Sequence, residues 1–427
     1  MDQPLSLQET IELVEETKSH VHSGHDCDKN EADLLLVSIA NANNKLAMNS
    51  DVKARNKHDN EPLSSAAHQG STPVTNVLIK ANAATNTQNE ELFPQLMSAV
   101  ECEDITLTQT LLHAQAAVNM QGLAHTTPLM AAARNGNLDI ARLLLAAHAA
   151  IEMPEQVYGY HSALLCAVEE GHFAMVEVLI HAKASIEVLN YLMKTPLLRA
   201  VELGYTAIAI LLIQAQARVD PESSGMESPL LIAARKGSTD LVKALLSRRA
   251  DVNAIDQDHE TSLSHAARGG HTQIVGALIA ARANLEYVNR GHMTPLLTAA
   301  ERGWAKIVKL LVSAKANVEA KCNGRTPLML AALRTNTEAA ETLIDAKANV
   351  DHVDRVDKNG LTALMYASIW NNTRMVEVLI NAQADPAVQD NTGLTALMHA
   401  VVRGHAKTVQ VLLAGVYRRA EREMHEI

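Results

Sequence analysis

Apolar and small residues recur along the chain with a long, regular period. The segments TTPLMAAARNG, ESPLLIAARKG and MTPLLTAAERG align without gaps and superimpose one leucine. The best-matched copies place that leucine at Leu129, Leu164, Leu197, Leu230, Leu263, Leu296, Leu328, Leu364 and Leu397. Neighbouring leucines are 32 to 36 residues apart, most often 33, and stepping back by 33 reaches Leu96 and Leu63. This period predicts about eleven repeats that stack on one another.

Each repeat contains the signals of two helices. Thr or Ser can cap the first helix, Pro or Ala fits its first position, and the leucine and alanines follow at helical spacing. A glycine such as Gly237 or Gly303 ends this helix, because Gly adopts the left-handed conformation at little cost. The next stretch, TDLVKALLSR in one copy, has apolar residues at i, i+3 and i+4. The sequence therefore predicts an inner helix, a turn, an outer helix and an extended, hairpin-like connection.

The two ends of the array need polar-faced caps, because a stack of repeats would otherwise expose its terminal apolar faces. Ser6 and Glu9 have the spacing of a capping box, and residues 18–31 are polar. Residues 1–57 are therefore predicted to form an N-terminal helical cap with a polar loop. Residues 58–415 form the predicted repeat array. The last segment, VYRRAEREMHEI, predicts a charged C-terminal cap helix over 416–427.

A 33-residue helix-turn-helix-hairpin unit with the TPLxxAA, Gly and ANV patterns resembles the ankyrin repeat, over roughly residues 58–415. The resemblance implies an all-α solenoid that binds proteins with its hairpin tips and the concave face of its inner helices. The family usually has His after the leucine, whereas this chain has mostly Met or Leu, which predicts apolar packing between repeats. The family's hairpin glycine is kept at Gly324, Gly360 and Gly393 only. Residues such as Met193, His259 and His292 replace it elsewhere, so less regular hairpins are predicted in the middle of the array.

Composition narrows the class of protein further. Only 3% of the 427 residues are aromatic, which suits thin layers of stacked helices rather than a large spherical core. The net charge of -11 disfavours a nucleic-acid partner. Four widely spaced cysteines, Cys27, Cys102, Cys166 and Cys322, indicate a reducing compartment. The N-terminus lacks the features of a signal peptide and no run of 18 apolar residues occurs, so a cytoplasmic protein is predicted, or one in the host cytoplasm if bacteria secrete it.

The sequence carries no catalytic motif of the phosphate-loop, dinucleotide-binding, zinc-protease or nucleophile-elbow types. Four residues, His20, His22, His25 and Cys27, are of the types that ligate zinc, but a short solvated loop explains them as well. Other histidines recur with the repeat, as at His172, His271 and His405, which indicates a structural role. No catalytic residue, metal or cofactor is expected.

The two residues before each helix-ending turn are the candidates for partner binding, since the resemblance places them on the concave face. They are acidic in the earlier repeats and basic in the later ones, which predicts a divided field that orients a partner. Three tyrosines at hairpin tips and one tryptophan beside a turn are candidate hot spots, or they pack between hairpins. The predicted partner-binding residues are Tyr158, Tyr160, Glu169, Glu170, Tyr191, Glu202, Arg235, Lys236, Arg268, Arg302, Arg334 and Trp370. Ordinary solvated surface is the alternative explanation of the charges.

The resulting prediction is a monomeric, non-catalytic scaffold or adaptor that binds one or more proteins. Three alternatives remain open. The chain could be a bacterial protein that acts on host proteins, a nucleic-acid binder that uses the basic stripe, or a carrier of some activity in residues 1–57.

Overall fold

A computed structural model describes residues 92–122, 125–152, 162–220, 227–353 and 359–425. The predicted N-terminal cap, the repeat anchored at Leu63, the histidine cluster around His22 and the tip residues Tyr158 and Tyr160 lie outside these ranges. The chain divides into two compact parts, Met1–Leu203 and Gly204–Ile427. Inner and outer helices alternate in both, as predicted. The described residues form isolated bridges but no named strand.

In the N-terminal part the inner helices are α5 (Phe93–Glu101), α7 (Pro128–Asn135), α9 (Ala163–Glu169) and α11 (Pro196–Leu203). Its outer helices are α6 (Ile105–His113), α8 (Leu138–Ala146) and α10 (Phe173–His181). Successive inner helices pack on one another, and so do successive outer helices. This part is therefore a two-layer stack.

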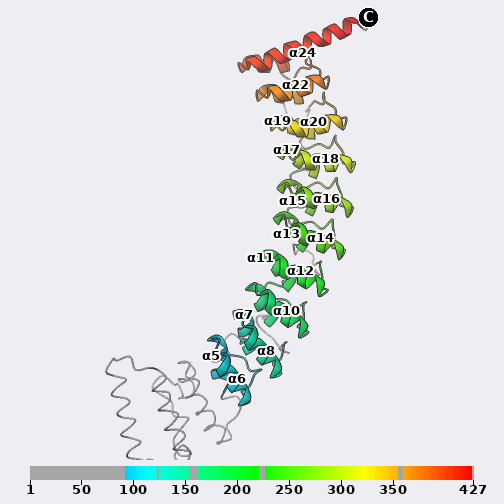
Figure 1. Cartoon of the computed structure of the whole chain (residues 1–427). Coiled ribbons are helices and arrows are strands. Elements are labelled where there is room, and N and C mark those ends of the chain that lie inside the picture. Colours follow the sequence, from blue (N-terminus) through cyan, green and yellow to red (C-terminus); the bar gives the residue numbers. More distant parts are fainter. Residues whose placement is uncertain (1–91, 123–124, 153–161, 221–226, 354–358, 426–427) are drawn as a thin grey trace, which may run out of the picture. The chain divides into compact units, whose positions relative to one another are not determined.

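The C-terminal part begins with the outer helix α12 (Thr206–Gln214). Its inner helices are α13 (Pro229–Lys236), α15 (Ser262–Gly269), α17 (Pro295–Arg302), α19 (Pro327–Leu333), α21 (Ala363–Ile369) and α23 (Ala396–Val402). The remaining outer helices are α14 (Thr239–Ser247), α16 (Thr272–Ala280), α18 (Ala305–Ser313), α20 (Thr337–Asp345), α22 (Thr373–Asn381) and α24 (Ala406–His425). Figure 1 shows α13 to α20 as two parallel columns of short helices.

The predicted start and stop signals act as expected. The hydroxyl of Thr294 accepts a hydrogen bond from the backbone N–H of Leu297, and Pro295 occupies the first turn of α17. Gly303 ends that helix with φ of 78°. The anchor leucines from Leu96 to Leu364 are at most 1% exposed, so they form the core between repeats.

Apolar packing replaces the family's histidine, as predicted. The residues after the anchor leucine are buried at Met130, Leu165, Leu198, Leu231, Leu297, Met329 and Met365. Ser264 is buried as well, with its hydroxyl against that of Thr261. The last residue of this series, Met398, is 45% exposed.

The prediction of less regular hairpins in the middle of the array is wrong for the described ones. Met193, His259 and His292 adopt φ of 56° to 59°, the same left-handed region as Gly360 and Gly393. The backbone N–H of His259 donates to Asp256 O, just as that of Gly393 donates to Asp390 O. In each of these two turns the side chain of the first residue, Asp256 or Asp390, accepts a hydrogen bond from a backbone N–H group four residues later. This hydrogen bond stabilises the turn and offsets the cost of a positive φ.

The connections are also tied from repeat to repeat by one register of carboxyl and amide side chains. Asn253 accepts from the backbone N–H of Asn284 at 2.8 Å, and Glu286 accepts from that of Asn317 at 2.8 Å. Asp351 accepts from the N–H of Asp385 at 2.7 Å, and Asp385 pairs with Arg419 of α24 at 2.7 Å. This ladder fixes the spacing between neighbouring repeats of the C-terminal part.

The last outer helix differs from the others. The α24 helix has 20 residues, whereas the outer helices before it have nine. Gly415 lets it continue past Ile380, because a Cβ there would lie 2.7 Å from an Ile380 methyl group. The segment 416–427, predicted as a charged cap helix, therefore extends α24 without a break as far as His425. Within the described residues, none of the helices combines the length and apolar character that a membrane span requires.

Candidate protein-binding surface

The candidate surface consists of the pre-turn positions, which are the two residues that follow the buried face of each inner helix and precede its turn. Because the helix presents one face to the core, its last turn carries these side chains outward. In the N-terminal part they include Glu169, Glu170 and Glu202. Glu170 is exposed, whereas Glu169 and Glu202 are half-buried.

The acidic pre-turn residues are largely paired within their own part of the chain. Arg199 of α11 donates to Glu202 at 2.9 Å and to Glu169 at 3.4 Å. Lys194 adds a contact to Glu202 at 2.5 Å. This pairing reduces the negative field that the acidic pre-turn residues produce.

The basic pre-turn residues of the C-terminal part are paired in the same way. Arg235 binds Glu227 and Arg268 binds Glu260, in each case a glutamate eight residues earlier. Arg334 reaches Glu301 of the preceding repeat at 2.9 Å. Lys236 and Arg302 are exposed. The basic stripe is therefore weaker than the sequence alone indicates.

The Arg268–Glu260 pair differs from the others in its burial. The Glu260 side chain is only 5% exposed and also accepts a hydrogen bond from Asn289 at 2.6 Å. Its second oxygen is buried without a hydrogen-bond partner among the described residues. Removal of Arg268 would leave this buried carboxylate without its charged partner, which is costly.

We expect Arg268→Ala to lower the free energy of unfolding by about 2 kcal/mol, below the usual cost of breaking a fully buried pair because Arg268 is partly exposed. Glu260→Gln in the same chain should restore much of the loss. The control is Arg334→Ala, which breaks an exposed pair and should cost less than about 1 kcal/mol. Urea unfolding of the intact chain and these three variants measures the effects, and equal losses for the two arginines would contradict the role of burial.

The candidate aromatic residues are exposed where the structure describes them. Tyr191 is 63% exposed in the connection before α11, and Trp370 is 58% exposed at the end of α21. Neither is packed away between hairpins, which was the alternative explanation. Tyr191 belongs to the N-terminal part of the chain and Trp370 to the C-terminal part.

The residue after the turn links several pairs of neighbouring repeats by a hydrogen bond from its side chain, a role that the sequence indicated only for the histidines. His172 contacts Arg134 O at 2.9 Å, and His405 contacts Ser368 O at 2.9 Å. Asn336 donates to Glu301 O at 2.8 Å, and Trp304 donates to Arg268 O at 3.3 Å. Each of these side chains bonds to a backbone carbonyl group near the C-terminal end of the inner helix of the preceding repeat, where carbonyl groups lack partners within the helix. The prediction that the periodic histidines are structural is confirmed at His172 and His405.

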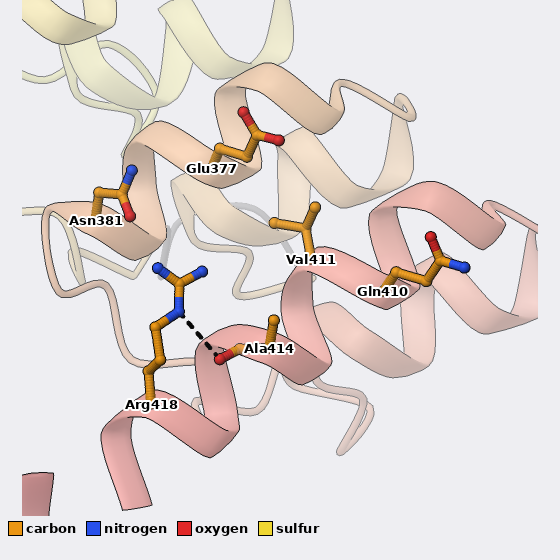
Figure 2. A pocket seen from close by; sticks show the side chains of 6 residues that line it. All are labelled: Glu377, Asn381, Gln410, Val411, Ala414 and Arg418. Atoms are coloured by element: carbon orange, nitrogen blue, oxygen red, sulfur yellow. Dashed lines mark hydrogen bonds between the residues drawn. The ribbon is translucent and has the colours of Figure 1, made fainter. Parts of the chain in front are cut away.

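A shallow polar groove lies between the outer helices α22 and α24 (Figure 2). Its volume is about 300 Å³, and its lining includes Glu377 and Asn381 from α22 and Gln410 and Arg418 from α24. Arg418 donates to the backbone oxygen of Ala414 at 3.3 Å. The groove shows no nucleophile and base in contact. Among the residues described, no cluster of three His, Cys, Asp or Glu could hold a metal ion.

The fold and the surface define a helical repeat solenoid. A family model of ankyrin repeats (three copies) matches residues 96–190, 129–224, 197–289, 263–354 and 349–420. The chain belongs to the ankyrin-repeat family, whose members generally serve as protein-binding scaffolds without catalysis.

Solved structures of the family are similar to parts of the chain. An ankyrin repeat domain from Acinetobacter baumannii AYE is 32% identical, with 44% of this chain and 97% of that one covered and a TM-score of 0.41. The human ASB11 ankyrin repeat domain is 24% identical, with 52% and 98% covered and a TM-score of 0.45. No curated protein matches the chain.

Proposed function

We propose that this protein is a non-catalytic scaffold that holds a partner protein on the pre-turn positions of its inner helices. The main support is the exposure of Trp370. This indole follows the last residue of α21 and is 58% exposed, whereas most large apolar side chains of the inner helices before α23 are buried. Tryptophan and arginine are the side chains most often found at binding hot spots, and Arg334 precedes Trp370 by one repeat.

The ion pairs favour a protein partner over nucleic acid. Binding to a phosphate backbone needs several cations that are free to replace counterions. Arg235, Arg268 and Arg334 each bind a glutamate instead. Such pairs can still exchange partners with a protein surface that offers both charges and hydrogen-bond donors.

Arg302 and Lys309 provide a matched test of the surface. Both are exposed basic residues of one repeat, Arg302 at a pre-turn position and Lys309 on the outer helix α18. We expect Arg302→Glu to weaken binding of a partner about tenfold, and Lys309→Glu to leave it nearly unchanged.

Partners would be captured from a lysate with the full chain, identified by mass spectrometry, purified and titrated against the two variants. If a purified partner loses affinity equally with both substitutions, the pre-turn surface is not its site. If no purified partner binds the intact chain, the scaffold proposal fails.

A further inference from the structure

The pre-turn positions change in character along the C-terminal part. At the first of the two positions, α13, α15 and α17 have Arg235, Arg268 and Glu301. The three helices that follow, α19, α21 and α23, have Leu333, Ile369 and Val402 instead. The inner face therefore changes from charged to apolar after α17.

The residue that precedes the capping Ser or Thr changes in the same way. Glu227 and Glu260 occupy this position before α13 and α15, where each binds an arginine, and Met293 and Arg325 occupy it before α17 and α19. Leu361 and Leu394 occupy it in the last two repeats. In these two inner helices both the residue before the cap and the first pre-turn residue are therefore apolar.

The resulting apolar surface is open to solvent. Val402 is 75% exposed, Val401 is 58%, Trp370 is 58% and Met398 is 45%. Met398, Val401 and Val402 lie within about one turn of α23, and α23 packs on α21, whose C-cap is Trp370. Met398 and Val401 occupy positions that the next inner helix covers in the earlier repeats, as at Met365 and Ser368, so they lie on the end face of α23. Trp370 and Val402 are the exposed apolar residues of the pre-turn positions. An exposed apolar patch of this kind marks an interaction site in a soluble protein.

The pre-turn charges beside this patch are basic, although Arg334 also pairs with Glu301 of the preceding repeat. The second pre-turn positions of the same three helices are Arg334, Trp370 and Arg403, and none of the six pre-turn residues is acidic. Arg403 is exposed, and its guanidinium contacts Nδ1 of His399 at 3.2 Å, which orients it on α23. The nearby Asp390 is only 8% exposed and is bound by His399 at 2.8 Å. A ligand therefore meets aliphatic side chains bordered by positive charge.

We propose that the inner faces of α19, α21 and α23 bind an amphipathic segment of a partner protein that carries apolar side chains beside Asp or Glu. This inference rests on the proposed scaffold function and gives it a location and a partner chemistry. Apolar side chains of the segment bury Trp370 and Val402, and its carboxylates pair with Arg403 and Arg334. Three of the four most exposed residues are aliphatic or thioether groups without a π face, so a protein segment fits better than stacked nucleotide bases.

A selection that makes no assumption about the site tests this proposal. The full chain is immobilised and challenged with a phage library of random 16-residue peptides, and the most enriched peptides are synthesised and titrated by fluorescence anisotropy. We expect peptides that combine large apolar residues with Asp or Glu. Val402→Asp should weaken them at least about tenfold, and Arg403→Glu should weaken them and reduce their dependence on salt.

The matched control is Val288→Asp, because Val288 is another exposed valine of the C-terminal part, at 46%, but lies in a connection. It should leave peptide affinity unchanged. Both valines are exposed, so both variants should melt with the intact chain when followed by circular dichroism. A fluorescent twenty-base oligothymidine serves as the nucleic-acid probe, and sedimentation velocity reports self-association.

Four outcomes would overturn the inference. Peptides that bind Val402→Asp as well as the intact chain would place the site elsewhere and leave the scaffold function standing. A failure to enrich any peptide would count against both proposals. Binding of the oligothymidine that Arg403→Glu abolishes would indicate nucleic acid, and a dimer that Val402→Asp dissociates would indicate a second copy of this chain as the occupant.

Discussion

Gly270→Ala is expected to destabilise the C-terminal part by about 3 kcal/mol, whereas Gly404→Ala should cost only about 1 kcal/mol. Both glycines lie in the turn after an inner helix, with φ of 76° and 72°, so both substitutions carry the cost of a left-handed alanine. A Cβ on Gly270 would lie 2.9 Å from the Trp304 ring, but nothing lies within 4 Å of one on Gly404. The difference between the two variants therefore measures the overpacking against a rigid indole.

Urea unfolding followed by Trp304 fluorescence, in a chain that carries Trp370→Phe, measures this difference. Trp304→Ser removes the fluorescent probe, so its unfolding is followed by circular dichroism. It should recover part of the Gly270→Ala loss, because Ser238 occupies the equivalent position of an earlier repeat without bulk. Equal losses for the two glycines would mean that the turn conformation alone sets the cost. An array of repeats need not unfold in one step, so the local probe matters.

The repeat pattern was sufficient to predict the helices because each repeat supplies its own signals. The capping Thr294, the leucine Leu296 and the terminal Gly303 act within a few residues of one another, and the structure confirms each of them. Hairpin regularity could not be predicted from glycine alone. The left-handed turn at His259 depends on a hydrogen bond from the backbone N–H of Glu260 to the Asp256 side chain, which offsets the cost that glycine avoids elsewhere.

The surface was harder to predict than the fold, because the charge of a residue does not show which residue of the chain forms an ion pair with it. The sequence nevertheless contains a signal of this pairing. Three pairs have opposite charges eight residues apart: Lys194 and Glu202, Glu227 and Arg235, and Glu260 and Arg268. A spacing of eight residues lets an ion pair form between the two ends of one inner helix. The change to Leu333, Ile369 and Val402 is visible in the same register, but their exposure depends on which neighbours cover them.

The second large effect on stability is expected from the loss of the Asp390 carboxylate, because this group is buried and both of its oxygens accept hydrogen bonds. One oxygen accepts from the backbone N–H groups of Thr392 and Leu394 and from the Thr392 hydroxyl, at 2.6 to 2.9 Å. The other contacts Nε2 of His399 at 2.8 Å. Burial acts to raise the pKa of Asp390, but these hydrogen bonds outweigh it and lower the pKa from 3.8 to about 2.

The direction of this shift fixes the pH dependence of stability. Because the carboxylate is more acidic in the folded chain, its contribution is complete above about pH 4 and is lost as the pH falls toward 2. The shift corresponds to about 2 kcal/mol. Asp390→Asn should therefore cost about 2 kcal/mol at pH 7, and the gap between the variant and the intact chain should narrow between pH 4 and pH 2.

Urea midpoints at a series of pH values test this prediction, with Asp258→Asn as the control. The Asp258 side chain is 81% exposed and lies 3.9 Å from Arg290, so its loss should change stability little, and its curve should run parallel to that of the intact chain. Arg403 has only donors to offer Nδ1 of His399, so Nε2 of that ring carries the proton that Asp390 accepts. If the Asp390→Asn gap stays constant down to pH 2, the geometry of these hydrogen bonds, and not the charge of the carboxylate, stabilises the last repeat.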